Sequence, residues 1–402
     1  MKKTIALIVS LLTVACIVIS LNKNDVETSE IPVFKDNNSI DMISTIESDI
    51  RFAEQAALRA ATSSDALNSG YLVVTDYLKA DGKNDVSDII QDLIDNNPNR
   101  TIYFPDGVYL IGKSIFTPAD PKKSVDLQLS NYAVIRASQD FSGEALIRLG
   151  GKDAANDTHT AGSNYSLTGG VIDACGKSNG ISIDSGRESV ISKTSIKNAV
   201  VGIHVKYGAN SGSSDADISD VNIIGTGSTD SVGILVEGFD NTFTNIRIGN
   251  VFIGVHLKSA SNSLRNIHPL YYSDYTDYEN SCGFFDECGS NIYDFCYSDQ
   301  FCIGFRTING VSSIYDNCFC FWYSATGGRE IAFRADGGFN SVASNFRCGF
   351  RGDTENSVLV TDKNKGRGIF DNLLYYSNDV SDFVHKKYTE GTFSNIINRL
   401  FS

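Results

Sequence analysis

Hydrophobic and polar residues alternate in a recurring pattern beyond Tyr71. One repeated unit has the form Gly-apolar-x-apolar, and its copies begin 21 to 31 residues apart. The copies are GISI from Gly180, GIHV from Gly202, GILV from Gly233, GVHL from Gly254, GFFD from Gly283 and GFRT from Gly304. Strict alternation of this kind predicts a short β-strand with one buried face.

A second alternating unit lies between the copies of the first. It reads ISDVNI from Ile218, FTNIRI from Phe243, LRNIHP from Leu264, IYDFCY from Ile292 and IYDNCF from Ile314. We expect each of these units to form one further strand. A repeat of just over twenty residues that holds short strands and no helix predicts the coils of a parallel β-helix, with insertions forming loops on its side.

The segment from residue 79 to 112 differs from the repeat. Ile89, Ile90, Leu93 and Ile94 recur at helical spacing and predict a helix over residues 85–97, followed by a strand, a Pro-Asp-Gly turn and a second strand. The first coil of a β-helix leaves unpaired backbone and exposed core. We therefore expect the helix to cap the N-terminal end, with these four side chains facing the first coil.

This segment also resembles a known family. ADGKNDVSDIIQDLIDNNPNRTIYFPDGVYLI is similar to the first-coil motif of the pectate-lyase-like superfamily of right-handed parallel β-helix proteins, in its rhamnogalacturonase/epimerase-like form. GGVIDACGKSNGISI from Gly169 resembles a coil of the same family. The resemblance implies an all-β fold, a right-handed single-stranded parallel β-helix (solenoid), and action on polysaccharides as a lyase, hydrolase or epimerase. The family's catalytic signatures are missing, so no catalytic residue is transferred.

Three regions follow from these patterns. Residues 1–22 join Lys2 and Lys3 to an apolar run, which indicates a signal peptide or a membrane anchor. Residues 23–70 are predicted to form a linker with a short helix, and residues 71–402 the β-helix domain. We expect the protein to be secreted or at the cell surface, and to meet a membrane only through its N-terminal segment.

The amino-acid composition restricts the kinds of ligand that the protein is expected to bind. The formal net charge of −14 argues against nucleic-acid binding, because no basic stripe is available to neutralise phosphates. No cofactor is predicted. Calcium is conceivable, but no EF-hand-like spacing appears. The nine cysteines include no C-x-x-C pair, which disfavours zinc and leaves disulfides and stacked thiols as alternatives. A polysaccharide is the predicted substrate or ligand.

Alternation in the Gly-apolar-x-apolar unit predicts which side chains point outward. The third position yields His204, Leu235, His256, Phe285 and Arg306, and the fifth yields Lys206, Glu237, Lys258, Glu287 and Arg334. Neighbouring coils would place these side chains about 4.8 Å apart. They could form a charge ladder that only stabilises the rod, or a site that mixes both charge signs and locally offsets the acidic background.

The insertion LYYSDYTDYENS, residues 270–281, is the feature that favours a site. It brings Tyr271, Tyr272, Tyr275 and Tyr278 together with Asp274 beside the coil of Glu287. Aromatic rings and carboxylates suit a sugar, which stacks through its C–H faces and needs acceptors for its hydroxyls. We therefore predict substrate binding by these residues and by Arg334.

Two enzyme chemistries and one binding function remain open. β-Elimination would use His256 or Tyr275 as the base and Lys258 or Arg306 to neutralise a uronate carboxylate. Hydrolysis would use Glu237 and Glu287, which we expect about 10 Å apart, near the inverting separation. The competing hypothesis is a noncatalytic polysaccharide-binding or adhesin-like surface module.

The alternation also predicts one side-chain direction that is energetically unfavourable. It would point Asp286 into the core, where an unpaired carboxylate is costly. We therefore expect the strand to end at Phe285 or to shift its register there.

Overall fold

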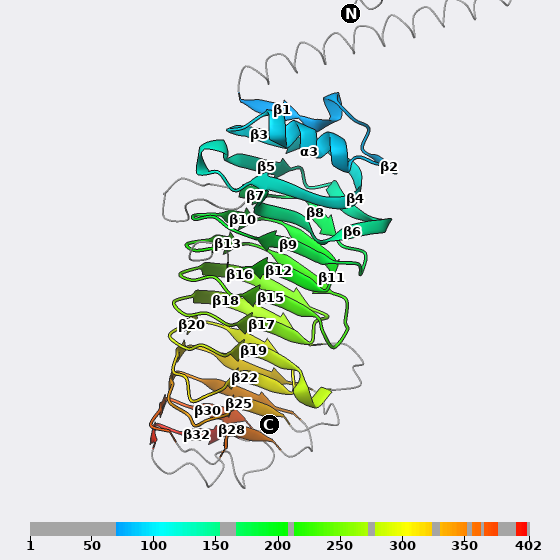
Figure 1. Ribbon diagram of the computed structural model, residues 1–402. Helices are drawn as coiled ribbons and strands as arrows, with labels where there is room; N and C mark the ends of the chain where they lie inside the picture. The colour runs from blue at the N-terminus through cyan, green and yellow to red at the C-terminus, as the bar shows by residue number, and fades with distance from the viewer. Residues whose placement is uncertain are drawn as a thin grey trace, which may run out of the picture. The chain divides into compact units, whose positions relative to one another are not determined.

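The protein's β-helix is seen in a computed structural model (Figure 1). The structure describes residues 70–152, 166–207, 213–271, 278–323, 330–351, 356–362, 366–376 and 391–399. Their strands pair in parallel, coil upon coil, in a right-handed solenoid. The predicted leader and linker, residues 1–69, lie outside the described residues.

Successive coils stack their strands into three parallel sheets, and most coils contribute to all three. Sheet I contains the first strand of each coil. Its members are β1 (Tyr71–Val73), β3 (Arg100–Phe104), β5 (Val125–Leu129), β7 (Ser166–Thr168), β10 (Val190–Ser192), β13 (Asp217–Ser219), the first half of β16 (Thr242–Gly249), the first half of β18 (Ser263–Leu270), β20 (Ile292–Asp294), β23 (Ile314–Asp316), β26 (Val342–Ser344), β29 (Ile369–Asp371) and β31 (Thr392–Ser394).

Sheet II follows sheet I after a short corner. Its members are β2 (Asp81–Asp85), the first halves of β4 (Gly107–Pro118) and β6 (Ala133–Lys152), β8 (Val171–Asp173), β11 (Ser195–Ala199), β14 (Asn222–Gly225), the second halves of β16 and β18, β21 (Tyr297–Asp299), β24 (Phe319–Trp322), β27 (Arg347–Phe350), β30 (Leu374–Tyr376) and β32 (Ile397–Arg399).

Sheet III is built from the Gly-apolar-x-apolar units. It consists of the second halves of β4 and β6, then β9 (Asn179–Ile183), β12 (Val201–Val205), β15 (Val232–Val236), β17 (Ile253–Leu257), β19 (Cys282–Asp286), β22 (Ile303–Thr307), β25 (Ile331–Ala335) and β28 (Ser357–Thr361).

Six successive units of sheet III, from Gly180 to Gly304, have a glycine where the next coil approaches closely. A Cβ added at Gly202 would lie 2.6 Å from the carbonyl oxygen of Gly233, and one at Gly233 would lie 2.5 Å from that of Gly254. Such distances are impossible for a real Cβ, so the repeated glycine permits the close approach of successive coils.

The copies of the second repeated unit from Phe243 and Leu264 each form one continuous strand, β16 and β18, as expected, whereas the copies from Ile218, Ile292 and Ile314 are each divided into two strands. The chain turns between sheets I and II at a residue with positive φ, for example Asp220 at 55°, Asn245 at 56° and Asn266 at 53°. Asn and Asp tolerate this left-handed conformation better than other non-glycine residues. Their side chains also form a ladder, in which Asn266 Nδ2 donates to Asn245 Oδ1 at 2.6 Å and Asn245 Nδ2 to Asp220 Oδ1 at 3.1 Å.

The predicted helix is α3 (Ser87–Asn96), at the N-terminal end of the solenoid (Figure 1). Ile90, Leu93 and Ile94 are buried and belong to the main hydrophobic core, but Ile89 is 40% exposed, so its predicted inward position is wrong. The Gln91 side chain fastens the helix to β4, because its Nε2 donates to Phe116 O and its Oε1 accepts from Phe116 N. A capping role for α3 stays a prediction.

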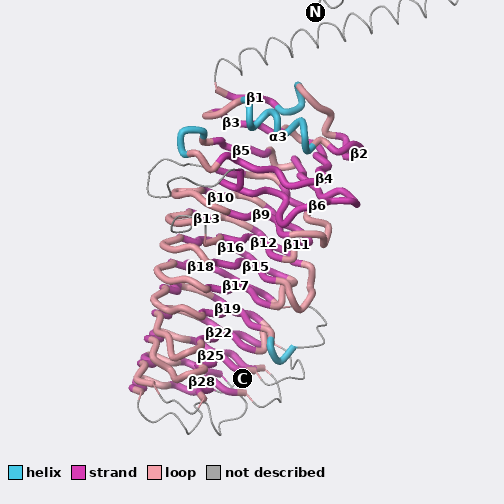
Figure 2. The backbone as a smooth tube through the Cα atoms, viewed as in Figure 1, coloured by secondary structure: helices cyan, strands magenta, loops and turns pink. Residues whose placement is uncertain are grey.

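Other helical segments within the described residues are short (Figure 2). They are the 3-10 turns η1 (Val74–Asp76), η2 (Pro121–Lys123) and η3 (Tyr278–Asn280). Over the part of the chain that the structure describes, no helix has the length and apolar character needed to span a membrane. Helices therefore contribute little to the described part of the fold, and most of its outward polar side chains lie on the three sheets.

Candidate functional site

The outward side of sheet III carries a row of charged and aromatic residues, which we call the charged face. Strand pairing aligns His204 with Leu235, Leu235 with His256, His256 with Phe285, and Phe285 with Arg306. This is the predicted order of the third position. The face is defined by His204, Lys206, Glu237, His256, Lys258, Phe285, Glu287, Arg306 and Arg334, together with Glu144, Arg148, Asp184 and Asp336, which contact them.

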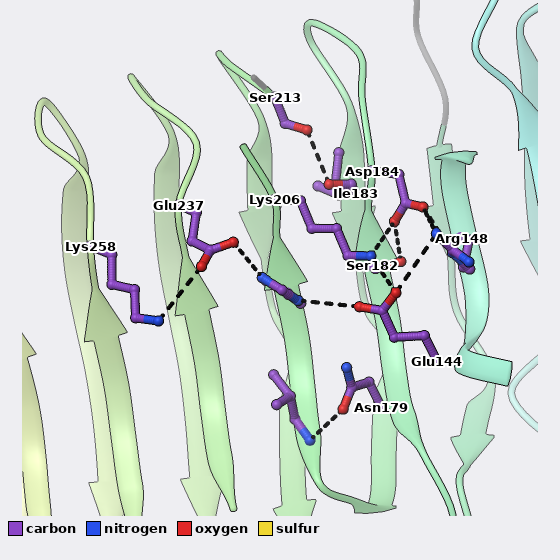
Figure 3. A network of polar contacts seen from close by, with 12 residues as sticks. Glu144, Arg148, Asn179, Ser182, Ile183, Asp184, Lys206, Ser213, Glu237 and Lys258 are labelled. Carbon is purple, nitrogen blue, oxygen red and sulfur yellow. Dashed lines mark hydrogen bonds and ion pairs between the residues drawn. The ribbon is translucent and has the colours of Figure 1, made fainter. Parts of the chain in front are cut away.

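The N-terminal part of the charged face is a closed ion-pair network (Figure 3). Arg148 pairs with Asp184, and Lys206 Nζ lies 2.6 Å from Glu144 Oε2 and 3.6 Å from Asp184 Oδ1. Ser182 Oγ donates to Asp184 Oδ1 at 2.5 Å. Glu144 lies on β6, before the glycine repeat begins, so only strand register could have identified it as a partner of Lys206.

His204 lies between two carboxylates of this network. Its Nε2 is 3.0 Å from Glu237 Oε2, and its Nδ1 is 3.9 Å from Glu144 Oε1. Lys258 Nζ approaches Glu237 from the other side, at 3.6 Å. Burial would raise the pKa of Glu237, but the hydrogen bond with His204 and the charge of Lys258 hold that pKa below its ordinary value.

His256 forms the second His–Glu pair, two coils further on. Its Nε2 lies 2.8 Å from Glu287 Oε1. Its Nδ1 has no hydrogen-bond partner among the described residues. Burial lowers the pKa of His256, although Glu287 opposes that change. The imidazole is therefore neutral at neutral pH, and its basic nitrogen Nδ1 carries no hydrogen bond to the described residues.

The aromatic ring of Phe285 separates His256 from Arg306. The His256 and Phe285 rings stack at a centroid distance of 4.6 Å and an interplanar angle of 12°. The Arg306 guanidinium lies 4.8 Å from the Phe285 centroid. Tyr278 and Phe285 both pack against a small buried cluster of Cys282, Cys302 and Ile303.

Arg334 occupies a different column from the predicted one. Strand pairing aligns it directly with Arg306, so it belongs to the third position rather than the fifth. Both guanidiniums contact Asp336, Arg306 Nη2 at 3.0 Å and Arg334 Nε at 2.9 Å. The predicted alignment failed because Ala332 takes the position of the glycine in this copy, so that the sequence pattern had been started two residues too early, at Glu330.

The structure divides the predicted tyrosine cluster. Tyr271 is 5% exposed and packs edge-on against Phe301 and Tyr278, so its burial corrects the expectation that its ring is open to a sugar. Tyr278 is half-buried and donates its hydroxyl to Gln300 O at 3.2 Å. Tyr272, Asp274 and Tyr275 lie outside the described residues.

Asp286 is inside the solenoid, contrary to our expectation that the strand would end or shift. β19 continues through Asp286, which is 1% exposed and in register with Leu257. Its Oδ1 accepts from the backbone N–H groups of Cys288 and Gly289 and from Asn291 Nδ2, at 2.7 to 3.1 Å. Its Oδ2 accepts from the Tyr293 and Ser313 hydroxyls at 3.2 and 2.7 Å. Five donors offset the cost of burying this carboxylate.

Neither disulfides nor a metal cluster occurs among the described residues. None of the eight cysteines from Cys175 to Cys348 forms a disulfide, and six of them are buried; Cys320 and Cys348 are aligned on paired strands. No group of three or more His, Cys, Asp or Glu side chains in the described ranges is arranged to hold a metal ion.

Comparisons with known proteins agree with this architecture. The sequence profile of the family described as "Rhamnogalacturonase A/epimerase, pectate lyase-like" matches residues 72–274. No curated protein sequence matches the chain.

Among solved structures, a double mutant of the tailspike protein of E. coli bacteriophage HK620 aligns with a TM-score of 0.60 and 11% identity, over 84% of this chain and 66% of the tailspike chain. The A-module of the Azotobacter vinelandii mannuronan C-5 epimerase AlgE6 aligns with a TM-score of 0.52 and 13% identity, over 81% of this chain and 99% of the module. At these identities, the likeness establishes the fold alone.

Proposed function

Because the chain belongs to the rhamnogalacturonase A/epimerase, pectate lyase-like family, we propose that it is an exported enzyme that binds a uronate-containing polysaccharide on the charged face and cleaves it by β-elimination. The observation that carries this proposal is the His256–Glu287 pair, which leaves Nδ1 without a hydrogen bond to the described residues and has Lys258 on the same face. Export by residues 1–22 remains an expectation from the sequence.

His256 has the properties of a general base. A neutral imidazole whose Nε2–H donates to Glu287 keeps its lone pair on Nδ1, and Glu287 stabilises the imidazolium that forms when Nδ1 takes a proton. The lowered pKa of His256 keeps the base unprotonated at neutral pH. The pair therefore unites an orienting carboxylate with a base, which is the arrangement that proton abstraction requires.

The proposed reaction is balanced without a further reactant. His256 Nδ1 removes the proton from the carbon next to the uronate carboxylate, and the electron pair of that C–H bond forms a double bond to the adjacent ring carbon. The glycosidic C–O bond on that ring carbon breaks, and the departing oxygen receives a proton from the imidazolium. Lys258 neutralises the carboxylate, which stabilises the negative charge that develops during proton removal.

Hydrolysis fits the same residues less well. A glycosidase needs one carboxylic acid whose pKa is raised, so that it can protonate the leaving oxygen. The pKa of Glu237 is instead lowered, and Glu237 and Glu287 are each engaged by a histidine. The geometry of the charged face therefore favours elimination over the two-carboxylate mechanism.

A noncatalytic polysaccharide-binding module is the second candidate. The observation in its favour is that the cations of the charged face have acidic partners: Arg148 with Asp184, Lys206 with Glu144, Lys258 with Glu237, and Arg306 and Arg334 with Asp336. A neutralised ladder of this kind stabilises a solenoid without any chemistry.

A polysaccharide panel distinguishes these functions. The purified protein is incubated with uronate-containing and neutral glycans, and unsaturated uronates are followed by ultraviolet absorbance while new reducing ends are counted. We expect both products to appear together on a uronate polymer. Reducing ends without unsaturation would establish hydrolysis instead, and binding without either product would establish the noncatalytic module.

A further inference from the structure

We propose that Phe285 is a positioning residue of the charged face, whose ring holds the His256 imidazole on one side and the Arg306 guanidinium on the other. The role deepens the proposed function and rests on it for its catalytic meaning. Phe285 itself has no group that could react. What it supplies is a flat apolar surface with two usable faces, placed on the coil between the base and the cation.

Both faces of the ring are occupied. The imidazole lies nearly parallel to it, with an interplanar angle of 12°, and the guanidinium covers it at 4.8 Å from the centroid. Nearly parallel rings at this centroid distance are in the range of favourable offset stacking, and a guanidinium is attracted to the negative face of an aromatic ring. Both partners are also anchored at their far ends, His256 by Glu287 and Arg306 by Asp336. Each side chain therefore has two contacts that fix its orientation.

The ring is itself held from the side of the solenoid. Phe285 packs with Tyr278 against the buried cluster of Cys282, Cys302 and Ile303. A rigid support matters for a base, because small misplacements of a reacting group are costly to rate.

The His204–Glu237 pair shows the same arrangement on the charged face without an aromatic ring beside the histidine. Leu235 occupies the position after His204, equivalent to that of Phe285 after His256. Leucine has no flat face on which an imidazole could stack, and there both imidazole nitrogens are directed at carboxylates instead. The aromatic residue thus coincides with the histidine whose Nδ1 is left open.

A loss of the ring should change the protonation of His256. The charged groups around this imidazole are Glu287, Lys258 and Glu237, with Arg306 on the far side of Phe285. Burial is the largest cause of its lowered pKa, and the Phe285 ring covers one face of the imidazole. Removing the ring admits water to that face, so the pKa of His256 should rise towards its ordinary value.

The test is a histidine titration by NMR on the full chain carrying 13C,15N-labelled histidine. In Phe285→Leu, we expect the His256 midpoint to rise by roughly 0.5 to 1 pH unit, a fraction of what full burial produces. Phe285→Tyr keeps both ring faces and should leave the midpoint where it is. His204, two coils away, serves as the internal reference and should not move in either variant.

The variants are first checked for an unchanged circular dichroism spectrum and melting temperature. If Phe285→Leu does not fold, Phe285→Met provides a flexible apolar replacement, and the same upward shift is expected. A His256 midpoint that stays unchanged in a folded variant without the ring would overturn the positioning role.

The activity readout separates this inference from the proposed function. On a glycan that is cleaved, the acidic limb of the kcat profile should move to higher pH in Phe285→Leu, in step with the NMR midpoint, and remain in place in Phe285→Tyr. If no glycan is cleaved, the proposed function fails, and the NMR midpoint still decides whether Phe285 controls His256. A moved midpoint with an unmoved rate profile would show that His256 is positioned by Phe285 but is not the base.

Discussion

The charged face contains two His–Glu pairs with the same construction and different surroundings. In both, histidine is followed two residues later by lysine, and a glutamate on the next coil approaches Nε2, at 3.0 Å for His204 and 2.8 Å for His256. His204 has a second carboxylate near Nδ1, whereas His256 has an aromatic neighbour and an open Nδ1. The same motif can therefore complete a structural network in one place and expose a base in another.

The largest expected effect separates the two histidines by rate. His256→Gln should lower kcat by about 10²–10⁴-fold, because general-base catalysis contributes that much. His204→Gln should change kcat only a few-fold, since its nitrogens serve the ion-pair network. Initial rates of unsaturated-uronate formation measure both. Equal losses in the two variants would abolish the distinction that we draw between the pairs.

The second prediction concerns the buried residue that precedes the glutamate of each His–Glu pair. Val236 and Asp286 are the buried strand-ending residues one position before Glu237 and Glu287. Asp286→Val, which copies the first region into the second, should destabilise the protein by about 3 kcal/mol, because Asn291, Tyr293 and Ser313 lose a buried acceptor.

Chemical denaturation measures that loss, and the neighbouring surface change Glu287→Gln is the control, with an expected cost within about 1 kcal/mol. An Asp286→Val protein as stable as the parent would mean that the buried network contributes nothing net.

The third prediction assigns the two pairs to different pH windows. The pKa of His256 is lowered from 6.5 in the folded protein, so between that value and its folded pKa the unfolded chain binds more protons, and stability falls as pH falls. The pKa of Glu237 is lowered from 4.5, so its contribution is complete above 4.5 and is lost as pH falls through its folded pKa.

Melting temperatures across pH test these windows. We expect His256→Gln to flatten the curve just below pH 6.5 and Glu237→Gln to flatten it only below pH 4.5. A reversed assignment, with the Glu237 variant flattening the upper window, would contradict the protonation states proposed for both pairs.

The smallest expected effect is on the lysines. Lys206→Gln should cost about 1 kcal/mol, and less at high salt, because its partner Glu144 is 43% exposed and solvent therefore screens that ion pair. Lys258→Gln should have a similarly small effect on stability but raise KM for a uronate polymer. Denaturation at two salt concentrations and steady-state kinetics provide the comparison. A KM increase that is as large for Lys206→Gln would extend the substrate site over the first pair.

Much of the fold was accessible from the sequence, because a solenoid repeats its strands. The spacing of Gly202, Gly233 and Gly254 predicted the coils and the outward order of the charged face, and both are confirmed by the strand register. The left-handed turn at Asp220, Asn245 and Asn266 was missed, because a single turn residue interrupts an apolar alternation without changing its appearance. The buried position of Asp286 was missed because alternation does not show that the turn after β19 directs four donors from residues 288–293 back to the carboxylate, where Ser313 of the next coil joins them.

The candidate site was accessible in part. The sequence identified His256, Lys258 and Glu287 as neighbours on one face, because alternation determines direction. It could not indicate that Nδ1 stays open or that Phe285 stacks on the imidazole, since these depend on side-chain rotamers. Tyr271 was predicted to bind the substrate because it lies in a tyrosine-rich insertion. Its position directly after strand β18 instead buries its ring against Phe301.

The most direct test of the account is the response of the two histidines to a short oligogalacturonate. With labelled histidine, the 1H–15N signals of His204 and His256 are recorded as the oligosaccharide is added at neutral pH. The account predicts a saturable shift of the His256 signals, with those of His204 nearly unchanged, because only His256 presents an open nitrogen to a ligand on the charged face. Saturable binding that shifts neither histidine, or shifts His204 alone, would contradict it.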